Sequence, residues 1–210
     1  MRRPFLIPAV FALAATVAAP MTLAGATPVA TPAPAGVSAP SSSTPGQPAA
    51  LCPTGWGSLP EDLSSSNTHP LRNIRTGTHP CYDRLVLDVP GTSSGAPLGH
   101  HVRYVGTVYE DGSGKPLPVR GGAVIEIVVN APSYDPATGA PAYPGHSGQP
   151  LPGVNLSGYP TFVDARFASS FEGQTQIGLG VRARLPFRVY QLDNRLVIDV
   201  AHSWNAVPAR

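Results

Sequence analysis

The sequence contains two cysteines, Cys52 and Cys81, together with six histidines, and these residue types can bind metals or do redox chemistry. In an oxidising compartment an isolated pair of cysteines forms a disulfide. Closing this loop of about 30 residues would stabilise the fold by roughly 3 to 4 kcal/mol. The alternative is a zinc site that adds His69 and His79, but this spacing matches no familiar zinc finger. We expect a structural disulfide and no metal.

The candidates for catalysis do not form a recognisable active site. Gly145-His146-Ser147-Gly148 departs from the G-x-S-x-G nucleophile elbow and lies in a proline-rich stretch. Asp88 and Asp199 are the one carboxylate pair that an internal repeat could bring together for glycoside hydrolysis. We expect both to be surface strand residues paired with arginines. The sequence therefore predicts no catalytic residue and no cofactor, and we expect the protein not to be an enzyme.

Arginines and tyrosines are better suited to binding a ligand. Four side chains share one parity and would form a stripe facing away from the core of a continuous strand: Arg182, Arg184, Arg188 and Tyr190. Guanidinium groups pair well with carboxylates and phosphates. Three rings in a long loop could stack on sugars: Tyr134, Tyr143 and Tyr159. The alternative is a solvated sheet face whose arginines pair with Asp88, Asp164 and Asp199.

The elements that would position these residues are β-strands, because apolar residues recur with period two. The alternating segments are 85–89, 123–129, 171–179 and 181–189. Turn-forming residues lie between strands at 111–114, 120–122 and 193–194. The prolines of 131–158 exclude a central strand, so we expect a long surface loop there. The fold class is all-β, a single antiparallel β-sandwich or open-barrel-like domain with one wet sheet face.

One heptapeptide occurs twice, with Asp83-Arg84-Leu85-Val86-Leu87-Asp88-Val89 matched by Asn194-Arg195-Leu196-Val197-Ile198-Asp199-Val200. Each copy places a polar residue and an arginine before an apolar ladder whose penultimate residue is aspartate. The repeat predicts two equivalent strands with a buried apolar face and an outward carboxylate, as in a duplicated sandwich. A chance match of common strand residues is the alternative.

The N-terminal quarter of the chain has the composition of an export signal and a linker. Arg2 and Arg3 precede a mostly apolar run of about 15 residues, which is shorter than the roughly 20 residues of a membrane-spanning helix. We predict a cleaved signal peptide at 1–26, an uncleaved anchor being the alternative, and no membrane span after cleavage. Residues 27–51 contain only small and polar residues and proline apart from a few aliphatics, and carry no charge, so they predict a disordered linker. The β domain then covers 52–210.

Charge excludes one class of partner. The chain carries a formal net charge of +2, and removal of Arg2 and Arg3 with the signal peptide leaves 14 less 2 basic residues against 12 acidic ones. A neutral domain without a basic patch is not expected to bind nucleic acid.

The order of motifs in the β region resembles the AMIN-like domain of exported actinobacterial envelope proteins. The resemblance rests on segments 75–89, 102–105, 111–119, 173–182 and 186–189. It implies a small β-sandwich displayed outside the cytoplasm, distantly similar to the AMIN domains that target wall amidases to the envelope. It supplies no catalytic residues, so we do not expect wall hydrolysis.

The sequence and the resemblance together predict a secreted or envelope-located binding module. Its expected partner is peptidoglycan or another wall glycopolymer. The alternative is a protein-interaction or structural domain that pairs with an envelope protein through a sheet edge. The sequence does not predict an oligomeric state.

Overall fold

The computed structural model describes residues 52, 55–67 and 69–204. The predicted signal peptide and linker lie outside these residues. Every regular element in the described part of the chain is a β-strand. No helix that could cross a membrane occurs there.

The strands form two main sheets and one short ribbon, all with antiparallel pairing. The five-stranded sheet has the order β1 (Glu61–Leu63), β4 (His100–Val105), β7 (Ala123–Val129), β9 (Gln174–Val181), β8 (Phe162–Phe171). The four-stranded sheet has the order β10 (Phe187–Leu192), β11 (Arg195–Ala201), β3 (Tyr82–Asp88), β2 (Asn73–Thr78). The ribbon pairs β5 (Val108–Tyr109) with β6 (Pro116–Leu117).

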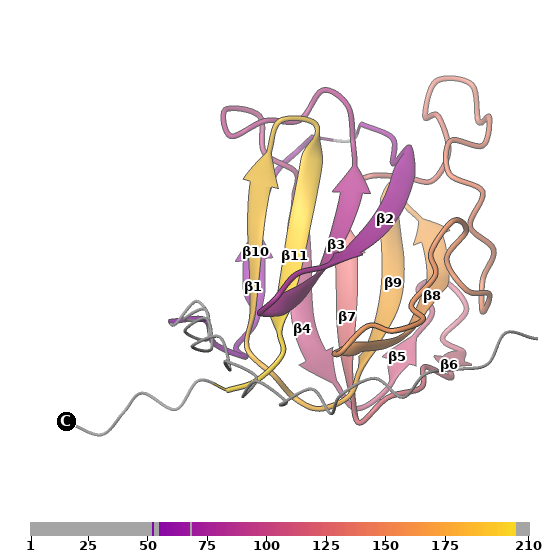
Figure 1. Cartoon of the computed structure of the whole chain (residues 1–210). Helices are drawn as coiled ribbons and strands as arrows, with labels where there is room; N and C mark the ends of the chain where they lie inside the picture. The colour runs from indigo at the N-terminus through magenta and orange to yellow at the C-terminus, as the bar shows by residue number, and fades with distance from the viewer. Residues whose placement is uncertain (1–51, 53–54, 68, 205–210) are drawn as a thin grey trace, which may run out of the picture. The chain divides into compact units, whose positions relative to one another are not determined.

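The two main sheets face each other as the layers of a sandwich, with the four-stranded sheet in front in Figure 1. Their inner faces supply a common core, in which Leu85 and Leu87 of β3 join Ile125 and Ile127 of β7 at zero exposure. Full burial of one such side chain stabilises the fold by roughly 1.5 to 3 kcal/mol. The predicted all-β sandwich is confirmed.

The two copies of the repeated heptapeptide are β3 and β11, which pair with each other in the middle of one sheet. Val86 lies opposite Val197, and each arginine lies opposite the aspartate of the other copy: Arg84 opposite Asp199, and Arg195 opposite Asp88. The copies are thus related by a local two-fold axis within a single sheet. They form two equivalent strands with buried apolar faces, as predicted.

The expectation of one strand over 171–179 was wrong. Glu172 and Gly173 both have positive φ, 48° and 82°, and form the turn of the hairpin between β8 and β9. Such a turn matches the twist of antiparallel strands. Phe171 is consequently 48% exposed at the end of β8, whereas Thr175, Ile177 and Leu179 face the core as expected.

The expectation of one strand over 181–189 was also wrong. β9 ends at Val181 and β10 begins at Phe187, and the residues between them connect the two sheets. Only Arg188 and Tyr190 of the predicted stripe therefore lie on a strand.

The outer face of the five-stranded sheet is less exposed to solvent than its polar residues suggested. The ribbon β5–β6 folds onto this face, where Val108 and Leu117 form a second small core with Ala168. Glu126 and Gln176, expected to face solvent, are 7% and 2% exposed and hydrogen-bond to each other at 2.9 Å.

The long segment at 131–158 contains no strand, as expected, but it is not a purely surface loop. Its Leu151 and Tyr143 enter the main core. Three backbone hydrogen bonds tie the segment to the free edge of β8, among them Leu151 N to Ala165 O at 3.0 Å. In Figure 1 it runs beside β8 at the right of the sandwich.

The predicted disulfide is present between Cys52 and Cys81, whose Cα atoms are 5.3 Å apart. Cys81 immediately precedes β3 and is 8% exposed. The bond therefore attaches the segment before β1 to the start of a central strand.

Candidate functional site

The outer face of the four-stranded sheet carries a row of three charged side chains. Arg188 in β10, Asp199 in β11 and Arg84 in β3 are direct cross-strand neighbours. The Asp199 side chain has no exposed surface. It accepts hydrogen bonds from Nε and Nη2 of Arg84 at 2.7 and 3.0 Å and from Nε and Nη2 of Arg188 at 2.9 and 2.8 Å. One buried carboxylate thus fixes two guanidinium groups.

Aromatic rings surround both guanidinium groups. The central carbon of Arg188 lies 4.2 Å from the ring centre of Trp56, 4.9 Å from Tyr190 and 5.7 Å from Tyr82. That of Arg84 lies 5.1 Å from Tyr82 and 5.8 Å from Tyr190. These distances are within the range of cation–π attraction. We call this set the arginine–aromatic cluster: Trp56, Tyr82, Arg84, Arg188, Tyr190 and Asp199.

The electrostatics of the cluster favour the charged form of Arg84 and the neutral form of Tyr190. The hydrogen bond to Asp199, opposed by burial, raises the pKa of Arg84. Burial and the charge of Asp199 raise the pKa of Tyr190 in spite of the two nearby arginines. Both tyrosine hydroxyls accept hydrogen bonds from Arg84 Nη2, at 2.7 Å for Tyr190 and 3.1 Å for Tyr82.

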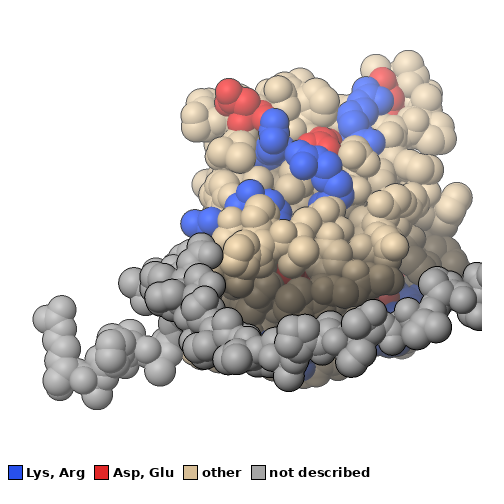
Figure 2. Space-filling model, in the orientation of Figure 1, with Lys and Arg blue, Asp and Glu red and all other residues tan. Residues whose placement is uncertain are grey.

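The cluster keeps donors available for a ligand. Nη1 of Arg84 and Nη1 of Arg188 have no hydrogen-bond acceptor among the described residues, and the two side chains are 24% and 37% exposed. The same sheet face carries Arg75 and Arg195, so four arginines face two aspartates, Asp88 and Asp199. Figure 2 views this face and shows basic side chains gathered over it.

The other two residues of the predicted stripe lie outside the cluster. Arg182 donates a hydrogen bond to the backbone oxygen of His202. Arg184 lies 4.8 Å from the ring centre of Tyr104 and donates to the backbone oxygen of Ser58 at 2.8 Å. The two sit in the connection between the sheets and do not continue a stripe.

The three loop tyrosines are also dispersed. Tyr143 is 3% exposed, and burial raises its pKa, so its ring is not accessible for stacking on a sugar. Tyr159 stacks on Phe162 at 5.9 Å and donates a hydrogen bond to Thr76. Tyr134 is half-buried and forms an isolated bridge with Pro141.

The carboxylates considered for catalysis are separated. Asp88 and Asp199 lie toward opposite ends of the β3–β11 ladder, and each pairs with arginine, as expected: Asp88 binds Arg75 at 3.0 Å. The expectation that both lie at the surface was wrong for Asp199, which the arginines cover completely. The buried Asp83 accepts hydrogen bonds from His202 and Thr78, at 3.0 and 2.9 Å. Because the threonine hydroxyl donates to the carboxylate and not to the imidazole, this trio is not an activated nucleophile.

No group of three or more metal-ligating side chains occurs in the described segments. Of the alternative zinc ligands, both cysteines are in the disulfide. His79 stacks on Tyr82 with ring centres 4.5 Å apart.

Three members of the cluster were not predicted from sequence: Trp56, Tyr82 and Arg84. The repeated heptapeptide contained the signal for Arg84, because an antiparallel pairing of its two copies places that arginine opposite Asp199. No sequence pattern indicated Trp56, since it precedes the first strand and reaches the cluster only through tertiary contacts.

The comparisons with known proteins agree with this architecture. The AMIN-like domain model matches residues 69–202, which run from just before β2 to just after β11. No curated protein and no solved structure matches the chain. Domains of this kind are typically extracytoplasmic, and the disulfide fits an exported protein. Since the match covers more than half of its length, the chain belongs to the AMIN-like family of envelope-related domains.

Proposed function

We propose that this protein is a non-catalytic binding module of the cell envelope that holds peptidoglycan or a related wall glycopolymer on the arginine–aromatic cluster. One observation carries the proposal: three aromatic rings and two guanidinium groups are fixed around one buried carboxylate. A site held in place before binding loses little conformational entropy when the ligand arrives.

The chemistry of the cluster suits an acidic polysaccharide. The half-buried rings of Trp56 and Tyr190 offer apolar faces with polar edges, on which sugar rings can stack, while Tyr82 is itself stacked on His79. The unpaired Nη1 groups of Arg84 and Arg188 can pair with carboxylate or phosphate oxygens. The cluster is on an open sheet face, which allows a long polymer to pass across it.

The proposed absence of catalysis rests on how the acidic groups are used. Asp83 is held by the backbone nitrogens of Thr161 and Phe162, at 2.7 and 3.0 Å, in addition to its side-chain partners. Asp199 is saturated by arginines. Each of these carboxylates is buried and engaged by hydrogen-bond donors of the protein, so it is not placed to contact a ligand.

Recognition of an envelope protein through a sheet edge is the competing function. β2 and β10 are the edge strands of the four-stranded sheet. The free edge of β8 is covered by the segment 146–151. A partner strand would therefore add to β2, to β10 or to β1, the other edge of the five-stranded sheet, and leave the cluster uncovered.

Sedimentation with wall sacculi stripped of protein tests the proposal. We expect the wild-type protein to sediment with the sacculi, and Trp56→Ala and Tyr190→Ala to remain largely in solution because each removes a stacking ring. Thermal unfolding of both variants verifies that they fold.

Tyr109→Ala is the matched control, because Tyr109 is 57% exposed on the β5–β6 ribbon, which packs on the five-stranded sheet. Its retention should equal that of the wild type. A wild-type protein that stays in solution would contradict wall binding and favour the sheet-edge function. Equal retention of all variants would place wall binding away from the cluster.

A further inference from the structure

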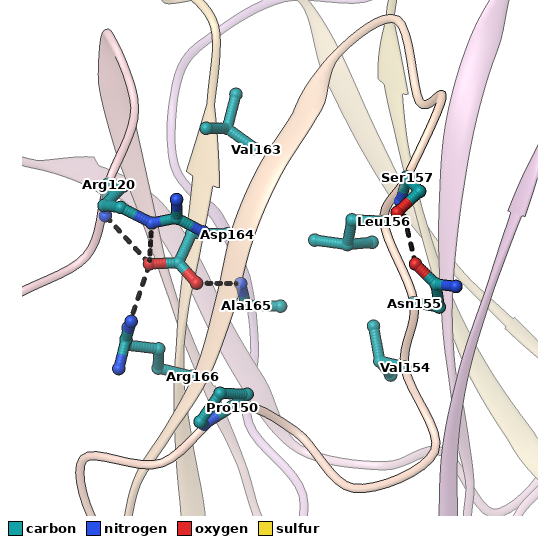
Figure 3. Close-up of a pocket in the computed structure, with 10 residues that line it drawn as sticks. All are labelled: Arg120, Pro150, Val154, Asn155, Leu156, Ser157, Val163, Asp164, Ala165 and Arg166. Carbon is teal, nitrogen blue, oxygen red and sulfur yellow. Dashed lines mark hydrogen bonds and ion pairs between the residues drawn. The ribbon is translucent and has the colours of Figure 1, made fainter.

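A hollow of about 410 Å³ lies on the five-stranded sheet, between the start of β8 and the loop at 154–157. Its size is within the range of small-molecule sites, roughly 300 to 1,000 Å³. Figure 3 shows Arg120, Asp164 and Arg166 along one wall, with Asn155 and Ser157 on the facing loop. The side chains of Val154 and Leu156 point into the space between them.

The charged wall is organised by a single carboxylate. Asp164 is 5% exposed and its Oδ2 accepts hydrogen bonds from Arg120 N at 3.0 Å and Arg166 Nε at 2.9 Å. Burial alone would raise the pKa of Asp164, but these hydrogen bonds lower it overall. Arg166 is held further by the backbone oxygen of Gly148 at 2.9 Å.

Arg120 is the cation available to a ligand. Its side chain is 73% exposed, and its Nε lies 3.5 Å from Asp164. Its two terminal nitrogens have no hydrogen-bond acceptor among the described residues. Because two arginines share one aspartate, this wall carries an excess of one positive charge.

Three glycines fix the backbone of Arg120 at this wall. A Cβ atom on Gly180 would lie 1.8 Å from the backbone oxygen of Arg120. Cβ atoms on Gly121 and Gly122 would approach the backbone of Val181 and Arg182 to 2.7 and 2.1 Å. The loop that carries Arg120 packs so tightly on the end of β9 that no side chain fits at these positions. The backbone of Arg120, from which its side chain extends, is therefore held in place.

The facing loop complements this cation with an amide and an aliphatic surface. Asn155 accepts a hydrogen bond from Ser157 N at 3.0 Å through Oδ1, and its amide nitrogen has no acceptor in the described part of the chain. Val163, 38% exposed, continues the aliphatic surface. Among the residues that the structure describes, no aromatic ring lines the hollow, so it is not a stacking surface for sugars.

We propose that this hollow binds the free carboxyl terminus of a short peptide with small aliphatic side chains. The terminal carboxylate pairs with the guanidinium of Arg120, a methyl-sized side chain contacts Val154 and Leu156, and the amide of Asn155 donates to a peptide carbonyl. A wall peptide and the C-terminus of a protein share this chemistry and differ in the configuration of their residues. The site is separate from the arginine–aromatic cluster, so it does not depend on the proposed polysaccharide binding.

Titration of the isotopically labelled protein with acetyl-alanyl-alanine, followed by amide NMR, tests the proposal. The all-L and the all-D peptide are both used, and each is compared with its C-terminal amide. We expect amide shifts at 154–157 and 163–166 with at least one free acid, and affinity about tenfold or more lower for the amides because the charge-assisted pair is lost. The configuration that binds identifies the source of the ligand.

Arg120→Ala removes the guanidinium but keeps the backbone hydrogen bond to Asp164, and should weaken binding about tenfold or more. Arg120→Lys keeps the positive charge but lacks the two-pronged guanidinium, so its affinity should fall between those of the wild type and Arg120→Ala. Arg195→Ala is the control, because Arg195 is an exposed arginine of the four-stranded sheet. This variant should bind the peptide as the wild type does. No shifts with either free acid, equal binding of acids and amides, or unchanged binding by Arg120→Ala would each overturn the proposal. The sacculus experiment, which depends on Trp56 and Tyr190, can succeed or fail independently.

Discussion

At the scale of single residues, Asp199 organises the arginine–aromatic cluster. It is fully buried, whereas its partners Arg84 and Arg188 are partly exposed. Loss of one charge from a buried ion pair is costly because the remaining charges are left unpaired in a site of low dielectric constant. The carboxylate therefore contributes to stability and also fixes the positions of the binding side chains.

Asp199→Asn should lower the free energy of unfolding by about 2 to 4 kcal/mol, somewhat below the cost for wholly buried pairs because Arg188 is 37% exposed. Urea unfolding measures the change. Asp88→Asn is the control: Asp88 and its partner Arg75 are 26% and 48% exposed, so its loss should cost less than about 1 kcal/mol. Equal costs for the two variants would mean that Asp199 is not the centre of a buried network.

Asp164 makes the stability depend on pH. Its pKa in the folded protein is lowered, by hydrogen bonds that outweigh burial. The stability it contributes is thus fully present above its unfolded pKa of about 4 and is lost as the pH falls toward the folded value.

Asp164→Asn should consequently reduce the loss of stability between about pH 6 and about pH 3 relative to wild type. Urea unfolding across this range measures it. If the free energy of unfolding fell equally steeply with decreasing pH in both proteins, Asp164 would not be the titrating group.

Residue-level reasoning from sequence found only part of the cluster. Parity along the chain correctly grouped Arg188 with Tyr190, because both lie in β10. It wrongly added Arg182 and Arg184, since alternation continues in the sequence across a connection between sheets. It could not find Trp56, whose position depends on tertiary contacts that no local pattern encodes.

At the scale of elements, close approaches of backbone decide where several glycines occur. The loop that carries Arg120 contacts β9 at Gly180, with 1.8 Å between the Arg120 oxygen and a Cβ built there. The contacting atom is backbone, so it cannot move aside without shifting the whole loop.

Gly180→Ala should therefore destabilise the protein by about 1 to 3 kcal/mol, as overpacking does, and displace Arg120 from the hollow. Gly106→Ala is the matched control, because a Cβ at Gly106 meets no atom within 4 Å. Thermal unfolding of both variants checks this. A Gly180 variant as stable as the Gly106 variant would contradict the tight packing of this loop.

The disulfide links an element with little core of its own to β3. Reduction should lower the free energy of unfolding by about 3 to 4 kcal/mol, because the open chain gains entropy when unfolded. Urea unfolding with and without reductant measures the effect, and the double variant Cys52→Ser, Cys81→Ser should be insensitive to reductant. An unchanged midpoint on reduction of the wild type would contradict a stabilising role.

Strand prediction succeeded where one face alternates without interruption, as at 123–129, which matches β7 in both bounds. It failed at 171–179 because alternation persists through the two-residue hairpin turn at Glu172 and Gly173. The prediction that Glu126 and Gln176 face solvent failed because the β5–β6 ribbon folds back over this face of the sheet.

At the scale of the whole domain, the all-β class followed from sequence because period-two ladders and turn residues recur along the chain. The assignment of strands to two sheets did not follow. It depends on crossovers such as the one from β9 to β10, and no local pattern distinguishes these from hairpins. Sequence reasoning also missed that the segment 131–158 closes one side of the sandwich. The prolines of this segment indicate a loop, but they do not indicate what the loop covers.

The local two-fold axis between β3 and β11 has a consequence for folding at high protein concentration. A strand that complements its own duplicate also complements the identical strand of a second molecule: paired antiparallel about Val86, two β3 strands would again set Arg84 against Asp88 and leucine against leucine. Because β11 lies far from β3 along the chain, an unfolded or partly folded molecule can expose a β3 strand that has not yet paired with its native partner. Refolding from denaturant should thus yield intertwined dimers whose fraction rises with concentration, as size-exclusion chromatography would reveal. The charge reversal Asp88→Arg, at a partly exposed position, should suppress them because it sets Arg84 against an arginine.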